Sequence, residues 1–255
     1  MVDLEPDFTG QTVVVTGGTR GIGRAITEAF ADLGADVVPT SRTEADVADA
    51  AEAVRDRGGE SLVFPTDVND RDAVAALFDR VDEELGGVDV VVNNAGINPR
   101  GALGDPSAVD ADEFDRTLDV NLRGAFACAK AAGPALRESG GALVNVASVG
   151  GVVGIPRQHP YVASKHGLVG LTKSLALDWA PEVRVTAVAP GYVTTDLTAE
   201  LRENDDLYRR LLDRTPMERF ADPEEVAGPV VFLASDLAAY VTGECLVVDG
   251  GWTAE

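Results

Sequence analysis

The sequence predicts an α/β fold in which a doubly wound parallel sheet of seven strands has helices on both faces. Short valine-rich runs that are apolar on both faces are typical of buried parallel strands. Stretches with apolar residues at helical spacing separate these runs, and this alternation favours the doubly wound arrangement. The predicted strands cover residues 12–17, 35–40, 61–66, 88–94, 141–148, 183–190 and 244–251.

The predicted helices cover residues 22–33, 70–85, 111–132 and 161–180. One charged segment, residues 192–220, has a helical pattern but is not followed directly by a strand. We interpret it as an insertion over the substrate cleft. No Pro-, Gly- or Ser-rich linker divides the 255 residues, so we expect a single domain over 1–255.

The charge balance is strongly acidic, with 43 Asp and Glu residues against 21 Lys and Arg and a net charge of −22. A field this negative repels phosphate backbones and anionic membrane surfaces, which argues against nucleic-acid and membrane partners. An acidic, lysine-poor surface resembles the surfaces of halophilic proteins from salt-loaded cytoplasm, where high salt relieves self-repulsion. We therefore expect folding or activity to be lost as salt is withdrawn.

The first ten residues contain neither a basic nor an apolar signal region, and no apolar run approaches the ~20 residues that span a bilayer. These observations favour a cytoplasmic protein. Cys128 and Cys245 lie in apolar stretches and are interpreted as buried small side chains. With two histidines and no acidic partner motif, the sequence predicts no metal site.

A glycine-rich turn, Thr16-Gly17-Gly18-Thr19-Arg20-Gly21-Ile22-Gly23, joins the first predicted strand to the first predicted helix. Glycines let the backbone turn tightly and approach a pyrophosphate, and the helix N-terminus offers unpaired N–H groups and a positive dipole end. The spacing G-x-x-x-G-x-G differs from the common G-x-G-x-x-G fingerprint. A mere tight turn is the alternative, but the position between strand and helix favours a dinucleotide site.

The second predicted strand ends near Ser41 and Arg42, at a point where an acidic residue would bind the ribose 2′-OH and favour NAD. A hydroxyl and a guanidinium suit a 2′-phosphate instead, and Arg20 lies on the same side. Either arginine alone could be a solvated side chain. Together, in so acidic a chain, they favour NADP(H), with NAD(H) as the alternative.

Two further strand ends supply candidate cofactor contacts, Asp67-Val68 and Asn93-Asn94-Ala95-Gly96. Asp67 is a candidate acceptor for an adenine amino group or, equally, the N-cap of the helix that begins near Asp70. Gly96 permits the backbone to approach the cofactor ribose closely.

Tyr161 and Lys165 are four residues apart on a predicted helix and therefore share one face. A tyrosine phenol with a pKa near ~10 is a poor base at neutral pH unless nearby positive charge stabilises the phenolate. Lys165 is placed to supply that charge. An isolated pair of this kind is more often a surface pair, but Ser148 and Asn121 upstream indicate a proton-transfer site.

Together these motifs resemble those of the short-chain dehydrogenase/reductase family over about residues 9–252, and they imply a Rossmann-like fold. The family's TGxxxGIG motif matches Thr16 to Gly23, its NNAG motif Asn93 to Gly96, its YxxxK motif Tyr161 to Lys165, and its PG motif Pro190-Gly191. The resemblance implies an NAD(P)-dependent oxidoreductase that transfers hydride between nicotinamide and a secondary alcohol or ketone.

The resemblance also implies residue roles. Tyr161 would exchange a proton with the substrate oxygen, and Ser148 would bind and orient that oxygen. Lys165 would hold the nicotinamide ribose and lower the pKa of Tyr161, while Asn121 would anchor a water molecule. The implied cofactor-binding residues are Gly17, Thr19, Arg20, Gly21, Ile22, Gly23, Ser41, Arg42, Asp67, Val68, Asn94, Ala95, Gly96, Tyr161, Lys165, Pro190, Gly191, Val193 and Thr194.

The motifs leave the substrate open. Residues 201–254 resemble the gluconate and deoxygluconate dehydrogenase branch, which favours a sugar, sugar acid or polyol. The candidate substrate-binding residues are Ser148, Arg157, His159 and Tyr192. The alternatives are a 3-oxoacyl-thioester reductase and, more remotely, a catalytically silent dinucleotide-binding protein. The family also implies a homotetramer.

Overall fold

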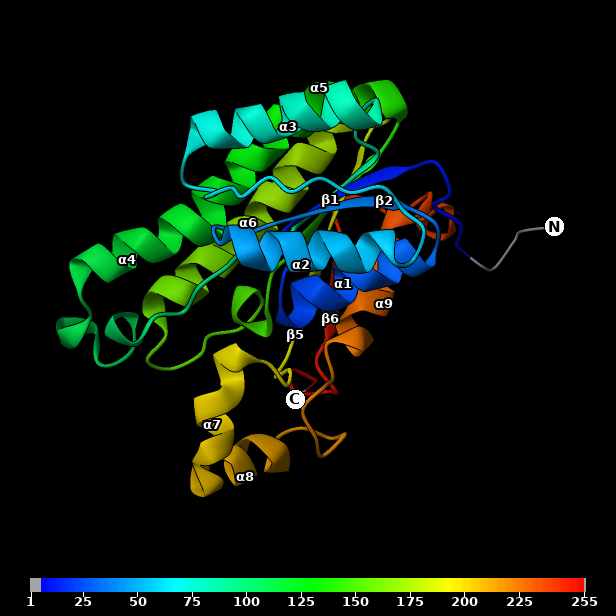
Figure 1. The fold of residues 1–255 in the computed structure, drawn as a ribbon. Helices are drawn as coiled ribbons and strands as arrows, with labels where there is room; N and C mark the ends of the chain where they lie inside the picture. Colours follow the sequence, from blue (N-terminus) through cyan, green and yellow to red (C-terminus); the bar gives the residue numbers. More distant parts are fainter. Residues whose placement is uncertain (1–5, 255) are drawn as a thin grey trace.

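The computed structural model describes residues 6–254 as a parallel sheet covered by helices on both faces (Figure 1). The strand order is β2-β1-β3-β4-β5-β6, and every neighbouring pair is parallel. The strands are β1 Thr12–Thr16, β2 Asp36–Thr40, β3 Val90–Asn93, β4 Ala142–Val146, β5 Arg184–Pro190 and β6 Cys245–Val248. This arrangement confirms the Rossmann-like α/β class.

The sheet has six strands, so the prediction of a seventh strand over residues 61–66 is wrong. This segment is extended beside β2, with Val37 N–H donating to Glu60 C=O at 3.1 Å and Thr66 N–H donating to Ser41 C=O at 2.7 Å. Between these two bonds Pro39 presents no N–H to the segment, because proline has none. The Val37 carbonyl accepts from the Ser61 hydroxyl instead of a backbone amide. A regular ladder therefore does not form.

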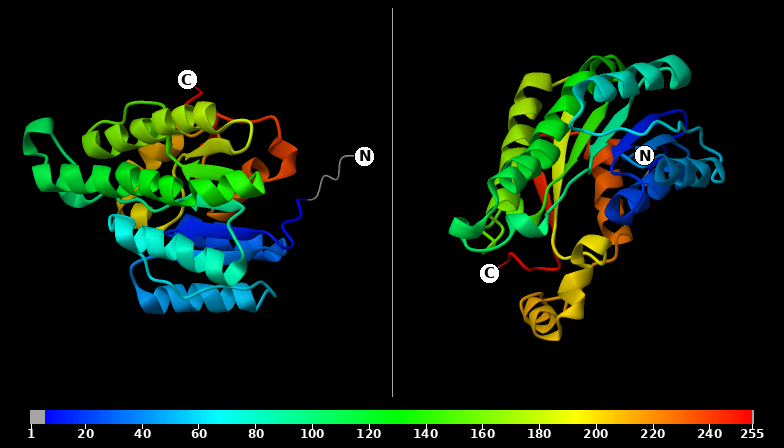
Figure 2. Two further views of the ribbon diagram at one scale, coloured as in Figure 1. Left: turned by 90° about the horizontal axis from the view of Figure 1, so that it is seen from above. Right: turned by 60° about the vertical axis from the view of Figure 1, so that its left-hand side comes forward.

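Two helical layers enclose the sheet, as both views of Figure 2 show. One layer contains α1 Gly21–Asp32, α2 Glu44–Arg55 and α9 Glu224–Ala234. The other contains α3 Arg71–Leu85, α5 Ala125–Ser139 and α6 His159–Trp179, with α4 Ala111–Leu118 continuing outward from α5. Each layer buries its own hydrophobic cluster against strand side chains that are almost fully inaccessible, which explains why the strands are apolar on both faces.

Local sequence signals set the helix boundaries. The Asp70 side chain accepts from the N–H groups of Asp72 and Ala73, so Asp70 is the N-cap of α3 and the N-cap alternative for Asp67 is wrong. The helix α3 ends at Gly86, where φ is 81°. The predicted helix over residues 111–132 is α4 and α5, joined by a π-helical turn, η3 Asp119–Gly124.

The segment 192–220 lies beyond the carboxyl ends of β5 and β6 (Figure 1). It contains η5 Asp196–Thr198, α7 Ala199–Glu203 and α8 Asp205–Asp213. Other single turns are η1 Arg100–Ala102, η2 Pro106–Ala108, η4 Val149–Gly151 and η6 Asp236–Ala238. Within the described chain, none of the helices is both long and apolar enough to cross a membrane.

The chain crosses from one side of β1 to the other after β2, because β3 pairs with the free edge of β1. In open parallel sheets such a reversal leaves a crevice outside the carboxyl ends of the strands, where ligands bind. The glycine-rich turn, the Asn93 to Gly96 segment and the residues after β4 and β5 all lie at that edge of the sheet.

Candidate active site

Tyr161 and Lys165 lie in the first two turns of α6 and face the same cleft. Lys165 Nζ is 5.8 Å from the centroid of the Tyr161 ring. Lys165 is 4% exposed, and its ammonium donates to the Val146 carbonyl oxygen at 2.7 Å. Burial lowers the pKa of Lys165 to about 8, because the charged form loses hydration.

Ser148 follows β4 and is the neighbour of Tyr161 across the cleft. Its Oγ accepts from the Gly150 N–H at 3.1 Å, which fixes the start of η4. A Cβ at Gly150 would lie 3.4 Å from Tyr161 Cε1 and 3.5 Å from Ser148 Oγ, so the three residues are in close contact. Burial raises the pKa of Tyr161, and a hydrogen bond with Ser148 acts in the opposite direction.

Burial therefore outweighs positive charge in setting the pKa of Tyr161 in the protein alone. The sequence predicts that Lys165 lowers that pKa, but among the described residues it is the hydrogen bond with Ser148 that opposes the effect of burial. The Lys165 ammonium donates to the Val146 carbonyl, and burial lowers the pKa of Lys165. A low pKa at Tyr161 would need further positive charge from outside the chain.

Asn121 connects the segment after β3 to α6 from inside the π-helical turn η3. Its side-chain amide exchanges two hydrogen bonds with the Ile97 backbone, at 2.8 and 2.9 Å, and donates to Ser164 Oγ at 3.1 Å. Ser164 in turn donates to the Tyr161 carbonyl at 2.7 Å. π-Helical turns occur often at functional sites. In this one the Asn121 side chain is 1% exposed and forms hydrogen bonds with both Ile97 and Ser164.

The backbone of the glycine-rich turn has a conformation and close contacts that only glycine permits. Gly17 and Gly21 have φ values of 63° and 51°, which favour glycine, and a Cβ at Gly23 would lie 2.0 Å from the Gly17 carbonyl oxygen. Asn94 Nδ2 braces the turn by donating to the carbonyls of Thr16 and Gly17 at 3.0 and 2.9 Å. No side chain caps the N-terminus of α1, so its first N–H groups face the turn and suit an anion.

Ser41 and Arg42 follow β2, and Arg20 lies in the glycine-rich turn just before α1. Ser41 Oγ is buried and has no hydrogen-bond partner among the described residues. Arg42 is exposed, and the Arg20 side chain is 77% exposed, with its guanidinium 3.9 Å from the Asp196 carboxylate. An unpartnered hydroxyl and two accessible guanidinium groups can donate hydrogen bonds to an anion.

Asp67 and Val68, which the sequence predicts to contact the adenine, both have partners within the protein. Asp67 Oδ1 accepts from the Asn69 N–H at 3.0 Å, which holds a turn before α3. Val68 is buried and packs closely on Gly124: a Cβ added to Gly124 would lie 2.7 Å from Val68 Cγ2. Asp67 is half-buried, with one carboxylate oxygen engaged in this turn.

The segment after β5 forms the opposite wall. The Gly191 N–H donates to the Val248 carbonyl at 2.9 Å, and the Thr194 N–H donates to the Ala221 carbonyl at 2.8 Å. Val193 is buried and forms an isolated parallel β-bridge with Ala221. These bonds hold residues 191–194 against the end of β6 on one side and the segment before α9 on the other.

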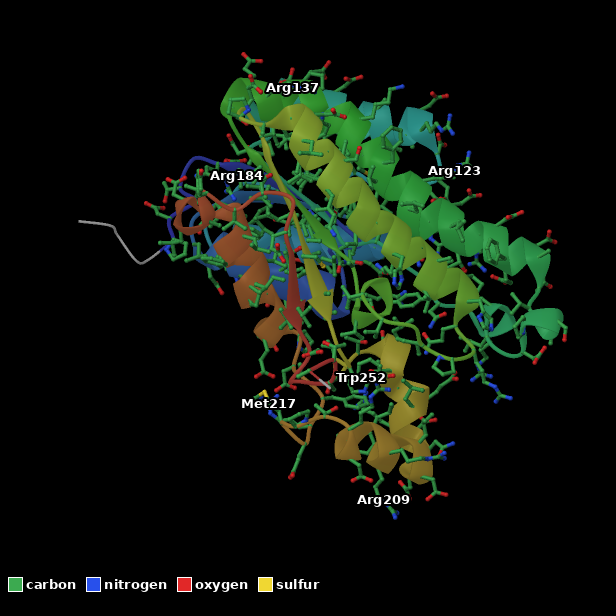
Figure 3. All side chains as sticks on the ribbon, turned by 180° about the vertical axis from the view of Figure 1, so that it is seen from behind. Arg123, Arg137, Arg184, Arg209, Met217 and Trp252 are labelled. Atoms are coloured by element: carbon green, nitrogen blue, oxygen red, sulfur yellow. The ribbon has the colours of Figure 1, made fainter. Side chains whose placement is uncertain are left out.

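Tyr192 lies in an aromatic cluster at the base of the 192–220 segment. It stacks on Phe220 at 5.3 Å and meets the edge of Trp252 at 5.7 Å between ring centroids. Figure 3 places Trp252 beside α7, close to the strand ends. Burial raises the pKa of Tyr192, the charge of Arg214 lowers it, and the Tyr161 phenol raises it, so the two phenols are within electrostatic reach.

Arg157 and His159 lie at the outer rim of the cleft. Both residues are exposed. Hydrogen bonds from Ser107 lower the pKa of the Asp105 carboxyl most, and the charges of Arg157 and His159 contribute less in the same direction. The structure thus groups Ser148, Tyr161 and Tyr192 on the inside and sets Arg157 and His159 apart from them, next to Asp105.

One hydrogen bond between two loops near the site is not indicated by any motif in the sequence. Asn98 Nδ2 donates to Gln158 Oε1 at 3.0 Å, joining the loop after β3 to the loop before α6. The only available signal was that both side chains are polar and close in sequence to recognised motifs. Among residues 6–254 no group of three or more His, Cys, Asp or Glu side chains is arranged to hold a metal ion.

A family model described as "Enoyl-(Acyl carrier protein) reductase" matches residues 16–253. Among curated relatives, a 3-oxoacyl-[acyl-carrier-protein] reductase of Staphylococcus aureus is 39% identical over 244 residues, covering 94% of this chain and 97% of its own. A cis-4-hydroxycyclohexanecarboxylate dehydrogenase of Sinomonas cyclohexanicum is 43% identical over 250 residues, covering 97% of this chain and 98% of its own.

An uncharacterised short-chain type dehydrogenase/reductase of Sinorhizobium fredii is 42% identical over 247 residues, 95% of this chain, which spans 44% of that longer protein. Among solved structures, a candidate NAD(P)-dependent gluconate 5-dehydrogenase of Beutenbergia cavernae with bound NADP at low occupancy has a TM-score of 0.91 and 40% identity. That match covers 98% of this chain and 99% of the other. The chain therefore belongs to the short-chain dehydrogenase/reductase family of NAD(P)-dependent oxidoreductases.

Proposed function

We propose that this protein is an NADP(H)-preferring oxidoreductase that interconverts a secondary alcohol and a ketone, with a sugar, sugar acid or polyol as substrate. The observation that carries the proposal is the buried contact between Ser148 and Tyr161, with the Lys165 ammonium 5.8 Å from the Tyr161 ring. A hydroxyl, a phenol and an ammonium in one cleft form a proton path to a substrate oxygen. The motif order along the chain supports the same assignment.

In this mechanism Tyr161 gives a proton to the substrate oxygen in reduction and accepts it in oxidation. Ser148 hydrogen-bonds the same oxygen and orients it towards Tyr161. Lys165 would hold the ribose hydroxyls of the cofactor, while Asn121 fixes the segment after β3 to α6 through Ile97 and Ser164. The nicotinamide, when bound, supplies the hydride and, in its oxidised form, a positive charge that lowers the pKa of Tyr161.

The NADP(H) preference rests on the donor set at the end of β2. The buried Ser41 hydroxyl has no partner among the described residues, and Arg20 and Arg42 are accessible. We assign Thr19, Ile22, Asp67, Val68, Ala95, Gly96, Val193 and Thr194 to the rest of the cofactor site because they lie at the same strand ends.

The sugar or sugar-acid assignment is supported by two similar proteins. The Beutenbergia protein is named for gluconate, and the Sinomonas enzyme for a cyclic hydroxy acid. Both names describe secondary alcohols that also have a carboxylate. Arg157 and His159 at the rim, and Tyr192 inside, are the side chains that we assign to such a substrate.

A 3-oxoacyl-thioester reductase is the second candidate, because the Staphylococcus enzyme matches nearly the whole chain. Steady-state assays separate the two. We expect NADP-dependent oxidation of gluconate-type hydroxy acids or polyols and reduction of their ketones, with slow turnover of acetoacetyl-thioester. Rapid thioester reduction with no activity on any polyol or sugar acid would reverse this order, and the absence of any turnover would favour the silent dinucleotide-binding alternative.

We further propose that the protein is a cytoplasmic homotetramer. The edge strand β6 has exposed Leu246 and Val247, and Phe232 on α9 and the fully exposed Tyr240 lie nearby in sequence. An unpaired apolar edge of this kind is usually covered by another chain. Light scattering of the wild type should give the mass of four chains, and Leu246→Asp should reduce it.

A further inference from the structure

The side chain of Asn98 is held on one side only. It lies in the loop after β3, and its Nδ2 donates to Gln158 Oε1 at 3.0 Å. The Gln158 backbone carbonyl accepts from the Val162 N–H at 2.8 Å, one residue after Tyr161. Because Gln158 Oε1 can only accept, Asn98 Nδ2 points to it and Asn98 Oδ1 points away.

Asn98 Oδ1 is buried and accepts no hydrogen bond from any described residue. A buried amide oxygen without a donor has lost water and gained nothing in return, so a donor that reaches it recovers free energy. Two other buried side-chain oxygens without a partner among the described residues lie at strand ends: Asn93 Oδ1, at the end of β3, and Ser41 Oγ, which has a phosphate to bind in the proposed function. Asn98 Oδ1 has no such assignment.

The position of Asn98 is fixed relative to the catalytic groups. Its neighbour Ile97 exchanges two hydrogen bonds with Asn121, at 2.8 and 2.9 Å. A Cβ on Gly96 would lie 3.5 Å from Lys165 Nζ and from Asn121 Oδ1. A second hydrogen bond, from the Gly104 N–H to the Arg157 carbonyl at 3.0 Å, also joins the loop after β3 to the loop before α6.

We infer that Asn98 binds a hydroxyl of the substrate other than the one that reacts, so that the enzyme selects polyhydroxy substrates over simple ketones and alcohols. The inference rests on the proposed function and narrows it. An acceptor oxygen requires a donor, and a ketone, thioester or carboxylate oxygen has no proton to give at neutral pH, whereas a hydroxyl has one. Gln158 is then a positioning residue that keeps Oδ1 turned towards the substrate.

The test compares alcohols that differ only in a second hydroxyl. With NADP⁺ as oxidant, kcat/KM is measured for cyclohexanol and for the vicinal cyclohexanediols. We expect the wild type to prefer at least one diol by about 10- to 100-fold, because a site built to bind a hydroxyl rejects the analogue that lacks it. Asn98→Leu should bring the ratio to within about threefold of unity, mainly through the KM of the diol.

Matched variants separate hydrogen bonding from packing. Asn98→Asp keeps an acceptor oxygen and should retain the diol preference, while Gln158→Leu should reduce it partially. Gln11→Leu alters a half-buried amide just before β1, at the opposite end of the sheet, and should leave the ratio unchanged. The dissociation constant of NADPH, measured by fluorescence for each variant, confirms that the cofactor cleft is intact.

If kcat/KM of the wild type is about the same for cyclohexanol and for every diol, the inference is overturned, and no variant is needed to show it. A ratio that survives Asn98→Leu, with NADPH binding intact, overturns it as well. Either result leaves the proposed function standing, since both alcohols are still oxidised. If the wild type turns over none of these alcohols and also none of the gluconate-type hydroxy acids and polyols, the proposed function itself is contradicted.

Discussion

The ammonium group of Lys165 donates a hydrogen bond to the backbone carbonyl of Val146 at 2.7 Å. Val146 is the last residue of β4, so the end of a buried strand holds the lysine directly. No described carboxylate forms an ion pair with this ammonium, and the side chain is 4% exposed. A neutral dipole compensates poorly for lost hydration, which is why the pKa of Lys165 falls to about 8.

The lowered pKa of Lys165 predicts a lysine signal that titrates near pH 8 in the protein without cofactor. Lys130, Lys165 and Lys173 are the lysines of the chain, so NMR of protein labelled at the lysine side chain gives a small set of signals. Lys165→Met should remove the one that titrates near pH 8. If the signal that disappears in this variant shows no change between pH 7 and 9, the buried ammonium is described wrongly.

The same shift predicts a difference in stability. Because the folded-state pKa of about 8 lies below the ordinary lysine pKa of 10.5, the unfolded chain binds the proton more tightly. The free energy of unfolding contributed by Lys165 should therefore rise as the pH increases from about 8 towards 10.5. Urea denaturation of the wild type and Lys165→Met across this range measures it, and parallel pH curves would contradict it.

Tyr161→Phe should lower kcat by about 10³-fold or more, since it removes the group that transfers the proton and leaves the ring in place. Cofactor affinity should change by less than threefold, because the proposed contacts to NADP(H) come mainly from other residues. Stopped-flow turnover and fluorescence titration measure the two effects. Tyr240→Phe, at a fully exposed tyrosine, is the matched control and should keep wild-type kcat. Undiminished turnover in Tyr161→Phe would refute the assigned role.

Much of this site was predictable because its residues follow strand ends in a fixed order. Glycine spacing, the Asn93 to Gly96 segment and the i, i+4 relation of Tyr161 and Lys165 are local patterns, and the structure brings them to one edge of the sheet. The number of strands was not predictable from apolarity. The run over residues 61–66 is as apolar as a strand, but the missing N–H of Pro39 in its neighbour prevents a ladder.

The electrostatic environment of the site residues also could not be predicted from the sequence. The sequence places Lys165 beside Tyr161 but cannot show that a carbonyl engages its ammonium or that burial raises the pKa of the phenol. Likewise, Arg157 and His159 are close to Tyr161 along the chain, but their charges act on Asp105. Whether two side chains meet depends on loop conformation, and Arg157 has a φ of 64° that no local pattern indicated.

The donor set at the end of β2 predicts how cofactor preference changes. Ser41→Ala and Arg42→Gln should each raise the dissociation constant of NADPH by about 10-fold, since each removes a hydrogen bond to a doubly charged phosphate. The affinity for NADH, which has no 2′-phosphate, should change by less than twofold. Arg209→Gln on α8, exposed far from β2 (Figure 3), is the charge-matched control for Arg42→Gln. Equal losses for both cofactors would place the 2′-phosphate elsewhere.

Arg184 predicts a large stability effect far from the cleft. Its guanidinium donates to the carbonyls of Leu233, Ala234, Ser235 and Ala238, at distances from 2.6 to 3.3 Å, and so closes the end of α9 (Figure 3). Arg184→Met leaves these carbonyls without their donor and should cost about 3 kcal/mol of unfolding free energy. Arg137→Met, at an exposed arginine that lies over Trp179, should cost about 1 kcal/mol or less. Equal urea midpoints for the two variants would contradict this.

Salt dependence follows from two opposing effects of screening. Salt weakens attractive ion pairs such as those that join Arg24 and Arg57 to Glu28, Asp32 and Asp49, but exposed pairs contribute little. It also relieves the repulsion within a chain of net charge −22, where acidic residues outnumber basic ones 43 to 21. Because repulsion involves far more groups, we expect the thermal midpoint to rise by several degrees between about 0.1 and 2 M KCl. Sucrose at matched osmolality separates screening from general exclusion effects, since it should raise the midpoint less. A midpoint that is flat or falls with KCl would show that the ion pairs dominate instead.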